Sequence, residues 1–268
     1  MDDGHSTHGD AAVLFERKAA VGTITLHNPR RLNALTFSMW QELADVLASA
    51  RDDAAIRVLV LRGSGEAAFC AGADISEFDS LRAGDTSKAY NKANHAAFQA
   101  LRECPKPTIA MIHGPCLGGG FQLAASCDLR LASVDAVFGI PAARLGLGYN
   151  PQWIATLVAA LGASAVKEMF FTASRFDVDW AVRNGFLRKA VPARELEGQV
   201  AALAEMIAQN APLTMRAAKA AIDAQSSSVG EENCAVLAAL ADACFASEDY
   251  AEGRRAFAEK RKAQFTGR

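Results

Sequence analysis

Short apolar runs rich in β-branched residues alternate with helical patterns along the first half of the chain. These runs have the length and composition of strands and cover residues 21–26, 57–62, 108–112 and 128–132. Between the first two, Thr36 precedes apolar residues that recur at spacings of three and four, which is the pattern of an amphipathic helix behind an N-cap. The alternation predicts an α/β core.

The second half of the chain is Ala-rich, and its pattern is mainly helical. A short apolar run at 187–191 indicates one more strand. Breaks at Pro212, Gly230 and Ser247 then separate four segments with helical patterns, namely 193–209, 213–226, 230–246 and 249–263. A helical extension is therefore expected after the α/β core.

These patterns divide the chain into three parts. Residues 1–10 are polar and are expected to form a flexible tail, residues 11–200 the core, and residues 201–268 the C-terminal helical region. The acidic start lacks the basic and apolar regions of a signal peptide, and no apolar run reaches the roughly 18 residues of a membrane span. We therefore expect a cytoplasmic protein that does not bind membranes.

Composition and charge narrow the possible ligands. The 268 residues include 28 Lys and Arg against 30 Asp and Glu, so no basic excess is available to attract a nucleic acid. The six cysteines form no CxxC pair, and no Cys and His cluster has the spacing of a zinc site. We expect no metal site, no nucleic-acid partner and reduced thiols.

Two glycine-rich segments follow predicted strands. The first, Gly63-Ser-Gly65 with Ala68, matches the G-x-G-x-x-A form of a dinucleotide fingerprint, but Gly72 stands where the required helix would run. The second, residues 118–120, leads directly into a helical pattern. Glycines at a helix start leave backbone N–H groups open, with the positive end of the helix dipole behind them. This end suits an anion or a developing oxyanion.

With these motifs, the chain resembles the crotonase superfamily, which includes enoyl-CoA hydratases and isomerases. The matching stretches follow the family's order over almost the whole chain. They are 28–35 (NPRRLNAL), 68–75 (AFCAGADI), 113–120 (HGPCLGGG), 127–128 (CD), 138–141 (FGIP) and 257–261 (FAEKR). The resemblance implies a spiral of ββα units with a C-terminal helical region that builds trimers, often paired into hexamers.

The resemblance also implies a reaction type and a ligand. Family members bind an acyl-coenzyme A thioester and stabilise an enolate-like oxyanion with two peptide N–H groups, here those of Ala73 and Gly119. Coenzyme A then enters as part of the substrate, and no permanently bound cofactor is implied. Ten further positions are implied to contact the substrate: Arg31, Leu32, Ala71, Asp74, Ile75, Leu117, Pro141, Leu145, Phe257 and Lys260. Of these, Phe257 and Lys260 are expected at the adenine and phosphate end.

The chain departs from the family at the two catalytic glutamates. Hydration needs a base for the water and an acid for the α-carbon, and the family's glutamate positions are occupied here by Gln122 and Ala142. A glutamine can orient a water but exchanges no proton near neutral pH. Tyr149 is the tentative substitute, although packing is its favoured role; Arg144 is a poor base, and Asn150 has lost the charge of an acid found in related isomerases.

Three functions therefore stay open at this stage. The leading one is an enoyl-CoA hydratase/isomerase family enzyme, nominally catalysing hydration. The second is a different reaction of the same family, either double-bond isomerisation or thioester hydrolysis. The third is a weakly catalytic oligomer that binds acyl-CoA. Cys70 and His113 are interpreted as structural residues.

Overall fold

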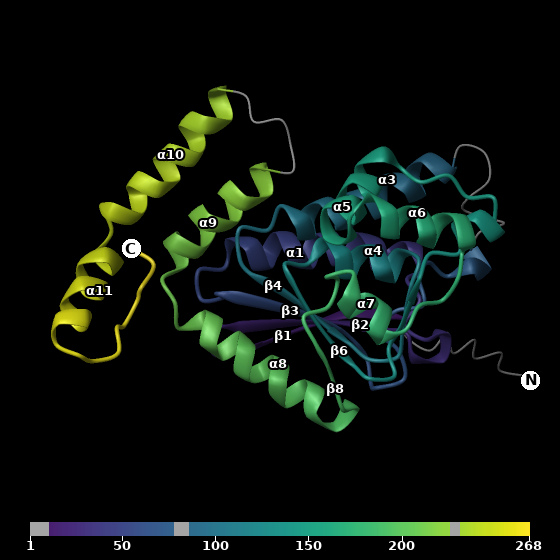
Figure 1. Ribbon diagram of the computed structural model, residues 1–268, viewed down its shortest axis with the longest axis horizontal. Coiled ribbons are helices and arrows are strands. Elements are labelled where there is room, and N and C mark those ends of the chain that lie inside the picture. The colour runs from purple at the N-terminus through teal and green to yellow at the C-terminus, as the bar shows by residue number, and fades with distance from the viewer. Residues whose placement is uncertain (1–10, 78–85, 226–230) are drawn as a thin grey trace, which may run out of the picture.

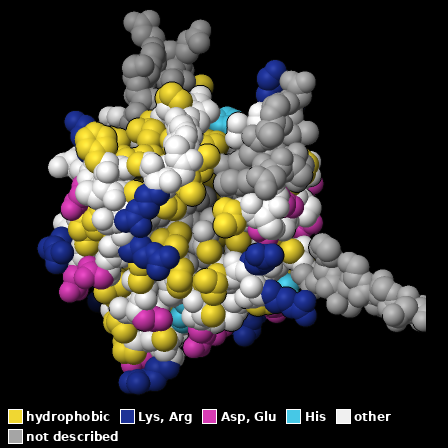
Figure 2. All heavy atoms as spheres, turned by 90° about the vertical axis from the view of Figure 1, so that its right-hand side faces the viewer, with side chains coloured by type: hydrophobic (Ala, Val, Ile, Leu, Met, Phe, Trp, Pro, Cys, Tyr) yellow, Lys and Arg dark blue, Asp and Glu magenta, His cyan; other side chains and the backbone are white. Residues whose placement is uncertain are grey.

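The computed structural model describes residues 11–77, 86–225 and 231–268. The tail predicted for residues 1–10 lies outside this part of the chain. No helix among the described residues is long and apolar enough to span a bilayer. Hydrophobic side chains on one face are interspersed with both acidic and basic groups, so neither sign of charge dominates there (Figure 2).

A six-stranded sheet in the order β1-β2-β3-β4-β6-β8 lies at the centre of the molecule (Figure 1). β1 and β2 form an antiparallel hairpin, and every later neighbour pairs in parallel. A second sheet is the parallel pair β5 and β7. The strands are β1 (Ala12–Lys18), β2 (Val21–His27), β3 (Val58–Gly63), β4 (Thr108–Ile112), β5 (Pro115–Leu117), β6 (Leu129–Ser133), β7 (Val137–Gly139) and β8 (Ala190–Val191).

The strand pattern of the sequence predicted most of this sheet. The runs at 21–26, 57–62, 108–112 and 128–132 correspond to β2, β3, β4 and β6 within one residue at each end. β1 was missed because its second half, Glu16-Arg17-Lys18, is charged and the strand is exposed at the edge of the sheet. The run at 187–191 contributes only Ala190 and Val191 to the sheet.

Helices bury both faces of the parallel part of the sheet. Leu59 and Leu61 of β3 belong to one apolar cluster, whereas Val58 and Val60 belong to another with α8 (Ala193–Ala208). The other face is covered by α1 (Phe37–Asp52), α3 (Thr86–Arg102), α4 (Gly119–Ser126), α5 (Pro151–Leu161) and α6 (Ala163–Thr172), while α7 (Val178–Arg183) lies beside β7 (Figure 1). Burial on both faces explains why β3 is a continuous apolar run.

The first helix begins where the sequence predicted. The hydroxyl of Thr36 accepts a hydrogen bond from the N–H of Met39 at 3.3 Å, which caps α1. Trp40, Leu43 and Leu47 are fully buried along one side of the helix. This apolar side places the indole of Trp40 in the core that supports the candidate site.

Three C-terminal helices extend away from the sheet at the left of Figure 1. They are α9 (Pro212–Ala224), α10 (Glu231–Phe245) and α11 (Glu248–Ala258), and they confirm the helical pattern of this region. The last helix ends five residues before the predicted end at 263, because the chain turns back after α11. The core boundary proposed at residue 200 falls inside α8.

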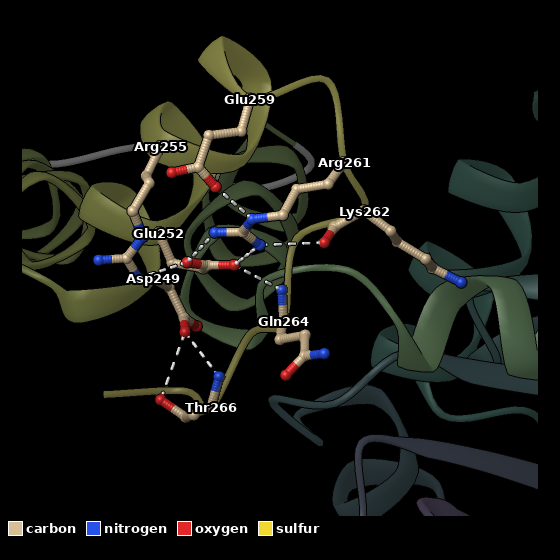
Figure 3. Close-up of polar contacts among 8 residues, drawn as sticks. All are labelled: Asp249, Glu252, Arg255, Glu259, Arg261, Lys262, Gln264 and Thr266. Atoms are coloured by element: carbon tan, nitrogen blue, oxygen red, sulfur yellow. Dashed lines mark hydrogen bonds and ion pairs between the residues drawn. The ribbon is translucent and has the colours of Figure 1, made fainter.

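A network of charged groups holds the returning C-terminal segment against α11 (Figure 3). The Glu252 carboxylate accepts hydrogen bonds from Arg261 Nη1 and Nη2, at 2.6 and 3.0 Å, and from the N–H of Gln264 at 3.0 Å. The Asp249 carboxylate accepts from the N–H of Thr266 at 2.6 Å. Hydrogen bonds from Arg261 hold the pKa of Glu252 well below its usual range.

Replacing Glu252 with Gln is expected to loosen this segment and to speed its removal by carboxypeptidase. One neutral amide oxygen replaces a carboxylate that accepts from Arg255, Arg261 and the N–H of Gln264, so Arg261 loses its ion pair with Glu252 and keeps only the exposed one with Glu259. Because the pKa of Glu252 is lowered, the carboxylate should hold the C-terminal segment at neutral pH and release it only in strong acid. Protection of the wild-type segment from carboxypeptidase should therefore persist down to about pH 5. The control Glu259→Gln changes an exposed partner of Arg261 and should leave protection near the wild-type level.

Candidate functional site

Two peptide segments from different parts of the chain meet at the N-terminus of α4. The loop after β3 runs without a helix to Asp74, as the glycine at position 72 predicted. Backbone pairing between residues 70 and 116, a single parallel β-bridge, holds the loop, and the thiols of both cysteines are free. Leu35 fixes its far end, because its N–H donates to Gly72 O and its carbonyl accepts from the N–H of Asp74, each at 2.8 Å. These two bonds bracket Ala73 on either side.

Gly119 lies directly across from this loop. Gly118 has φ of 52° and ψ of −117°, and its N–H donates to Gly139 O at 2.8 Å, so that α4 starts at Gly119 in a fixed position. A Cβ built on Gly72 would lie 3.4 Å from Gly119 N, and one built on Gly119 would lie 3.8 Å from Ala73 N. The two peptide groups are therefore neighbours, and no side chain separates them.

The backbone N–H groups of Ala73 and Gly119 are free to bind a ligand. Neither donates a hydrogen bond to a backbone or side-chain acceptor among the described residues. Gly119 is the first residue of α4, where the N–H groups have no partner within the helix and the helix dipole is positive. Two neighbouring N–H groups at such a place are of the kind that can stabilise a negatively charged oxygen.

Close packing beside this site makes Gly120 intolerant of a side chain. A Cβ there would lie 2.4 Å from the carbonyl oxygen of Cys70 and 2.7 Å from its Cβ. We expect Gly120→Ala to destabilise the protein by about 3 kcal/mol or more in urea unfolding, because the backbone of the loop must move.

The control for this prediction is the same substitution at an open helical site. Gly198 lies in α8 with nothing within 4 Å of its virtual Cβ. Gly198→Ala should stabilise the chain by roughly 0.5–1 kcal/mol through helix propensity. Equal effects of the two substitutions would contradict the close approach of α4 to Cys70.

The two donors open into a cavity of about 130 Å³. Eight of the residues named from the sequence line it: Ala71, Ala73, Ile75, Gly119, Pro141, Ala142, Leu145 and Tyr149. The sequence analysis missed other lining residues, which include Trp40, Asn91, Asn94, Phe98, Leu147 and Trp153. No Asp, Glu, His, Lys or Arg of the described chain belongs to the lining.

The two positions implied for catalytic glutamates differ in their surroundings. Gln122 is buried in α4; its Nε2 donates to Trp153 O at 3.4 Å, and its Oε1 has no partner in the described part of the chain. Ala142 is buried and borders the cavity. Neither side chain can carry a proton to or from a substrate near neutral pH.

Other candidate proton donors are placed as packing or capping groups. The ring of Tyr149 meets Trp153 and Phe170 edge to face, with centroids at 5.8 and 5.0 Å. Asn150 caps α5 by accepting from the N–H of Gln152 at 2.8 Å. Arg144 is exposed.

The residues interpreted as structural are buried. Burial raises the pKa of Cys70 to about 12, so its thiol is protonated and unreactive near neutral pH. Burial likewise lowers the pKa of His113, which favours the neutral imidazole. Cys70 also accepts a hydrogen bond from the N–H of Gly72 at 3.4 Å and so supports the loop that precedes Ala73.

Several residues implied to contact the substrate lie outside the cavity lining. Leu32 contacts a lining residue through its backbone: its carbonyl accepts a hydrogen bond from the N–H of Ala71 at 3.0 Å. Asp74 is buried and accepts from the hydroxyl of Ser76 at 2.7 Å. Arg31, Leu117, Phe257 and Lys260 are also absent from the lining. Phe257 is 88% exposed on α11, at the end of the molecule opposite α3 and α6 (Figure 1).

Comparison with known proteins places this chain in a family. The model of the Enoyl-CoA hydratase/isomerase family matches residues 16–268. The chain belongs to this family, within the crotonase superfamily, and is an enzyme of that family. Members of the family act on acyl-CoA substrates.

Individual relatives match over nearly their whole length. The short-chain-enoyl-CoA hydratase of Clostridium acetobutylicum is 34% identical over 252 residues, covering 93% of this chain and 95% of that protein. The crotonyl-CoA hydratase of Syntrophomonas wolfei is 32% identical over 255 residues, covering 94% and 97%. A crystal structure of an enoyl-CoA hydratase/carnithine racemase from Magnetospirillum magneticum has a TM-score of 0.89 at 37% identity and covers 97% and 96% of the two chains. The predicted crotonase-like fold is confirmed.

Proposed function

We propose that this chain binds an acyl-CoA thioester with its carbonyl oxygen between the N–H groups of Ala73 and Gly119. The supporting observation is that these two peptides lie side by side at the N-terminus of α4. Neither N–H group donates a hydrogen bond among the described residues. Hydrogen bonds at this place stabilise charge that develops on the oxygen in the transition state, and each contributes on the order of 3 kcal/mol.

The nominal reaction is hydration of an enoyl-CoA, but we propose that it does not follow the two-glutamate route. Gln122 and Ala142, which do not ionise, stand at the glutamate positions. Among the described residues that line the cavity, the phenol of Tyr149 is the one ionisable side chain. Gln122 can orient a water, yet the proton must then be transferred by the substrate, by water or by Tyr149. Slow hydration is the expected consequence.

The same lining gives a second candidate function. A cavity that polarises a carbonyl without a carboxylate also suits double-bond isomerisation or thioester hydrolysis, in which a substrate group or Tyr149 does part of the proton transfer. A weakly catalytic acyl-CoA-binding oligomer is the limiting case.

Incubation with crotonyl-CoA and longer enoyl-CoAs tests these reactions. Loss of the enoyl absorbance together with a mass gain of one water would support hydration. Free coenzyme A would indicate hydrolysis, and a changed double bond at constant mass would indicate isomerisation. Coenzyme A binding by calorimetry without turnover would support the binding oligomer. If none of the thioesters binds, the proposal is wrong.

We further propose a cytoplasmic homotrimer or dimer of trimers with no permanently bound cofactor. Large apolar side chains are exposed on the C-terminal helices, at Ile222, Val236, Phe245 and Phe257. Such residues on extended helices favour burial against another copy of the chain. In such an assembly a neighbouring chain could bring Phe257 and Lys260 to the adenine end of the ligand. Light scattering would measure the mass.

A further inference from the structure

Three of the side chains missed by sequence reasoning form one wall of the cavity. The ring of Phe98 meets Trp40 edge to face with centroids 5.2 Å apart. Asn94 precedes Phe98 by four residues on α3, so the two side chains share one face of the helix. The indole of Trp40 also packs on α4, since a Cβ built on Gly119 would lie 3.1 Å from its ring. This wall therefore adjoins the proposed oxyanion site.

The wall contains one acceptor and one donor without partners. Asn94 Oδ1 and Trp40 Nε1 are buried and make no hydrogen bond among the described residues. Asn94 is 3% exposed and Trp40 is fully buried, yet both line the cavity. Buried polar atoms are nearly always hydrogen-bonded in folded proteins, so two unpaired atoms at one wall need an explanation.

We propose that the cavity selects acyl groups that carry a hydroxyl, which is held between Asn94 Oδ1 and the N–H of Trp40. This inference rests on the proposed binding of an acyl-CoA. A hydroxyl donates one hydrogen bond and accepts others, so it matches an acceptor and a donor at once. If the amide of Asn94 is turned over, a hydroxyl still fits by accepting from the NH₂ group.

Other acyl groups match this wall less well. An unsubstituted hydrocarbon chain would leave both polar atoms unpaired and shut off from water. A carboxylate would be buried without a counter-charge, because no Lys or Arg of the described chain lines the cavity. A hydroxyl is the smallest substituent that satisfies both atoms without burying a charge.

Binding of the hydroxyl requires the Asn94 amide and the Trp40 indole to open toward the cavity. Without a ligand, Asn94 Oδ1 and Trp40 Nε1 both carry almost no exposed area. The second side-chain torsion of asparagine has a broad energy profile, so the amide plane can turn while α3 stays in place. Within the wall, the ring of Phe98 also packs edge to face against Trp153, with ring centroids 5.1 Å apart. This contact supports the position of Phe98 beside Asn94.

Calorimetry with pairs of saturated thioesters tests the preference without turnover. The pairs are butyryl-CoA with 4-hydroxybutyryl-CoA, pentanoyl-CoA with 5-hydroxypentanoyl-CoA and hexanoyl-CoA with 6-hydroxyhexanoyl-CoA. At the length that brings the hydroxyl to Asn94, we expect the wild type to bind the hydroxylated member about tenfold more tightly, a ratio that corresponds to 1.4 kcal/mol. Equal affinity within all three pairs would overturn the inference.

Variants on one face of α3 locate the preference. Asn94→Leu should abolish it while keeping or strengthening binding of the unsubstituted member, because the unpaired oxygen is removed. Asn91→Leu is the matched control: Asn91 borders the same cavity three residues earlier but is exposed, so its variant should keep the preference. A preference that survives Asn94→Leu would overturn the assignment to this residue.

The two proposals fail in different ways. If no thioester of any pair binds, the proposed acyl-CoA function is wrong and the hydroxyl preference is wrong with it. If both members of each pair bind equally, the acyl-CoA function stands and only the hydroxyl preference is wrong. Thermal unfolding of each variant shows whether it is folded at the temperature of the titration.

Discussion

Gly119→Pro is expected to lower kcat/KM about 100- to 1,000-fold relative to Gly119→Ala, because it removes one of the two proposed oxyanion donors. Gly119 is the first residue of α4, a position where proline fits the helix and its missing N–H breaks no helical hydrogen bond. The fold should therefore persist. The loss should appear with whichever thioester the wild type converts.

Gly119→Ala is the matched control because it adds a Cβ and keeps the N–H. That Cβ lies 3.1 Å from the ring of Trp40, a contact that both variants share. The infrared stretch of a ¹³C-labelled thioester carbonyl offers a second readout that needs no turnover. It should move to lower frequency on binding to the Ala variant and move less on binding to the Pro variant. Equal shifts in both variants would mean that Gly119 is not a donor.

Joint replacement of Gln122 and Ala142 by Glu is expected to raise the hydration rate of crotonyl-CoA by at least about a hundredfold. General acid and base groups each contribute roughly 10²–10⁴ to such a rate. A carboxyl at position 122 would be buried, which raises its pKa toward neutral pH. This carboxyl would also lie near the carbonyl oxygen of Trp153, which accepts a hydrogen bond from Gln122 in the wild type. Because a carbonyl can only accept, it would favour the protonated form of the new carboxyl.

Controls for the double variant separate charge from volume. Ala142→Gln with Gln122 unchanged fills the same space beside the cavity without a carboxylate and should give no gain. Gln122→Glu alone supplies one of the two groups and should give a smaller gain than the pair. If the double variant is folded, binds the thioester and is no faster than the wild type, the cavity itself has diverged from hydration.

The glycines at 118–120 indicated a helix start suited to an oxyanion, and the family resemblance then implied Ala73 and Gly119 as the two backbone donors. Gly72, Gly118 and Gly119 mark places where main chains approach closely, and that requirement is local and visible in the residue type. The family motifs then paired the segment at Ala73 with the segment at Gly119. The structure brings both segments to one cavity, although their use as donors is still a proposal.

The wall formed by Trp40, Asn94 and Phe98 could not be assigned in the same way. The apolar pattern of α1 predicted that Trp40 is buried, but a pattern does not say which cavity a buried ring borders. Asn94 left one signal, a polar residue among the buried Tyr90, Ala97 and Phe98 on one face of α3. Such a residue is equally compatible with a hydrogen bond inside the core.

The sequence by itself determined the main parallel strands, the helical C-terminal region, the glycine turns and the absence of acidic groups at positions 122 and 142, because these depend on residue type and local spacing. Only the tertiary structure decided that two peptides 46 positions apart face each other, at Ala73 and Gly119, and that an amide and an indole from different helices share a wall. Such contacts arise from the packing of α1, α3 and α4 on one face of the sheet, and no local pattern records them.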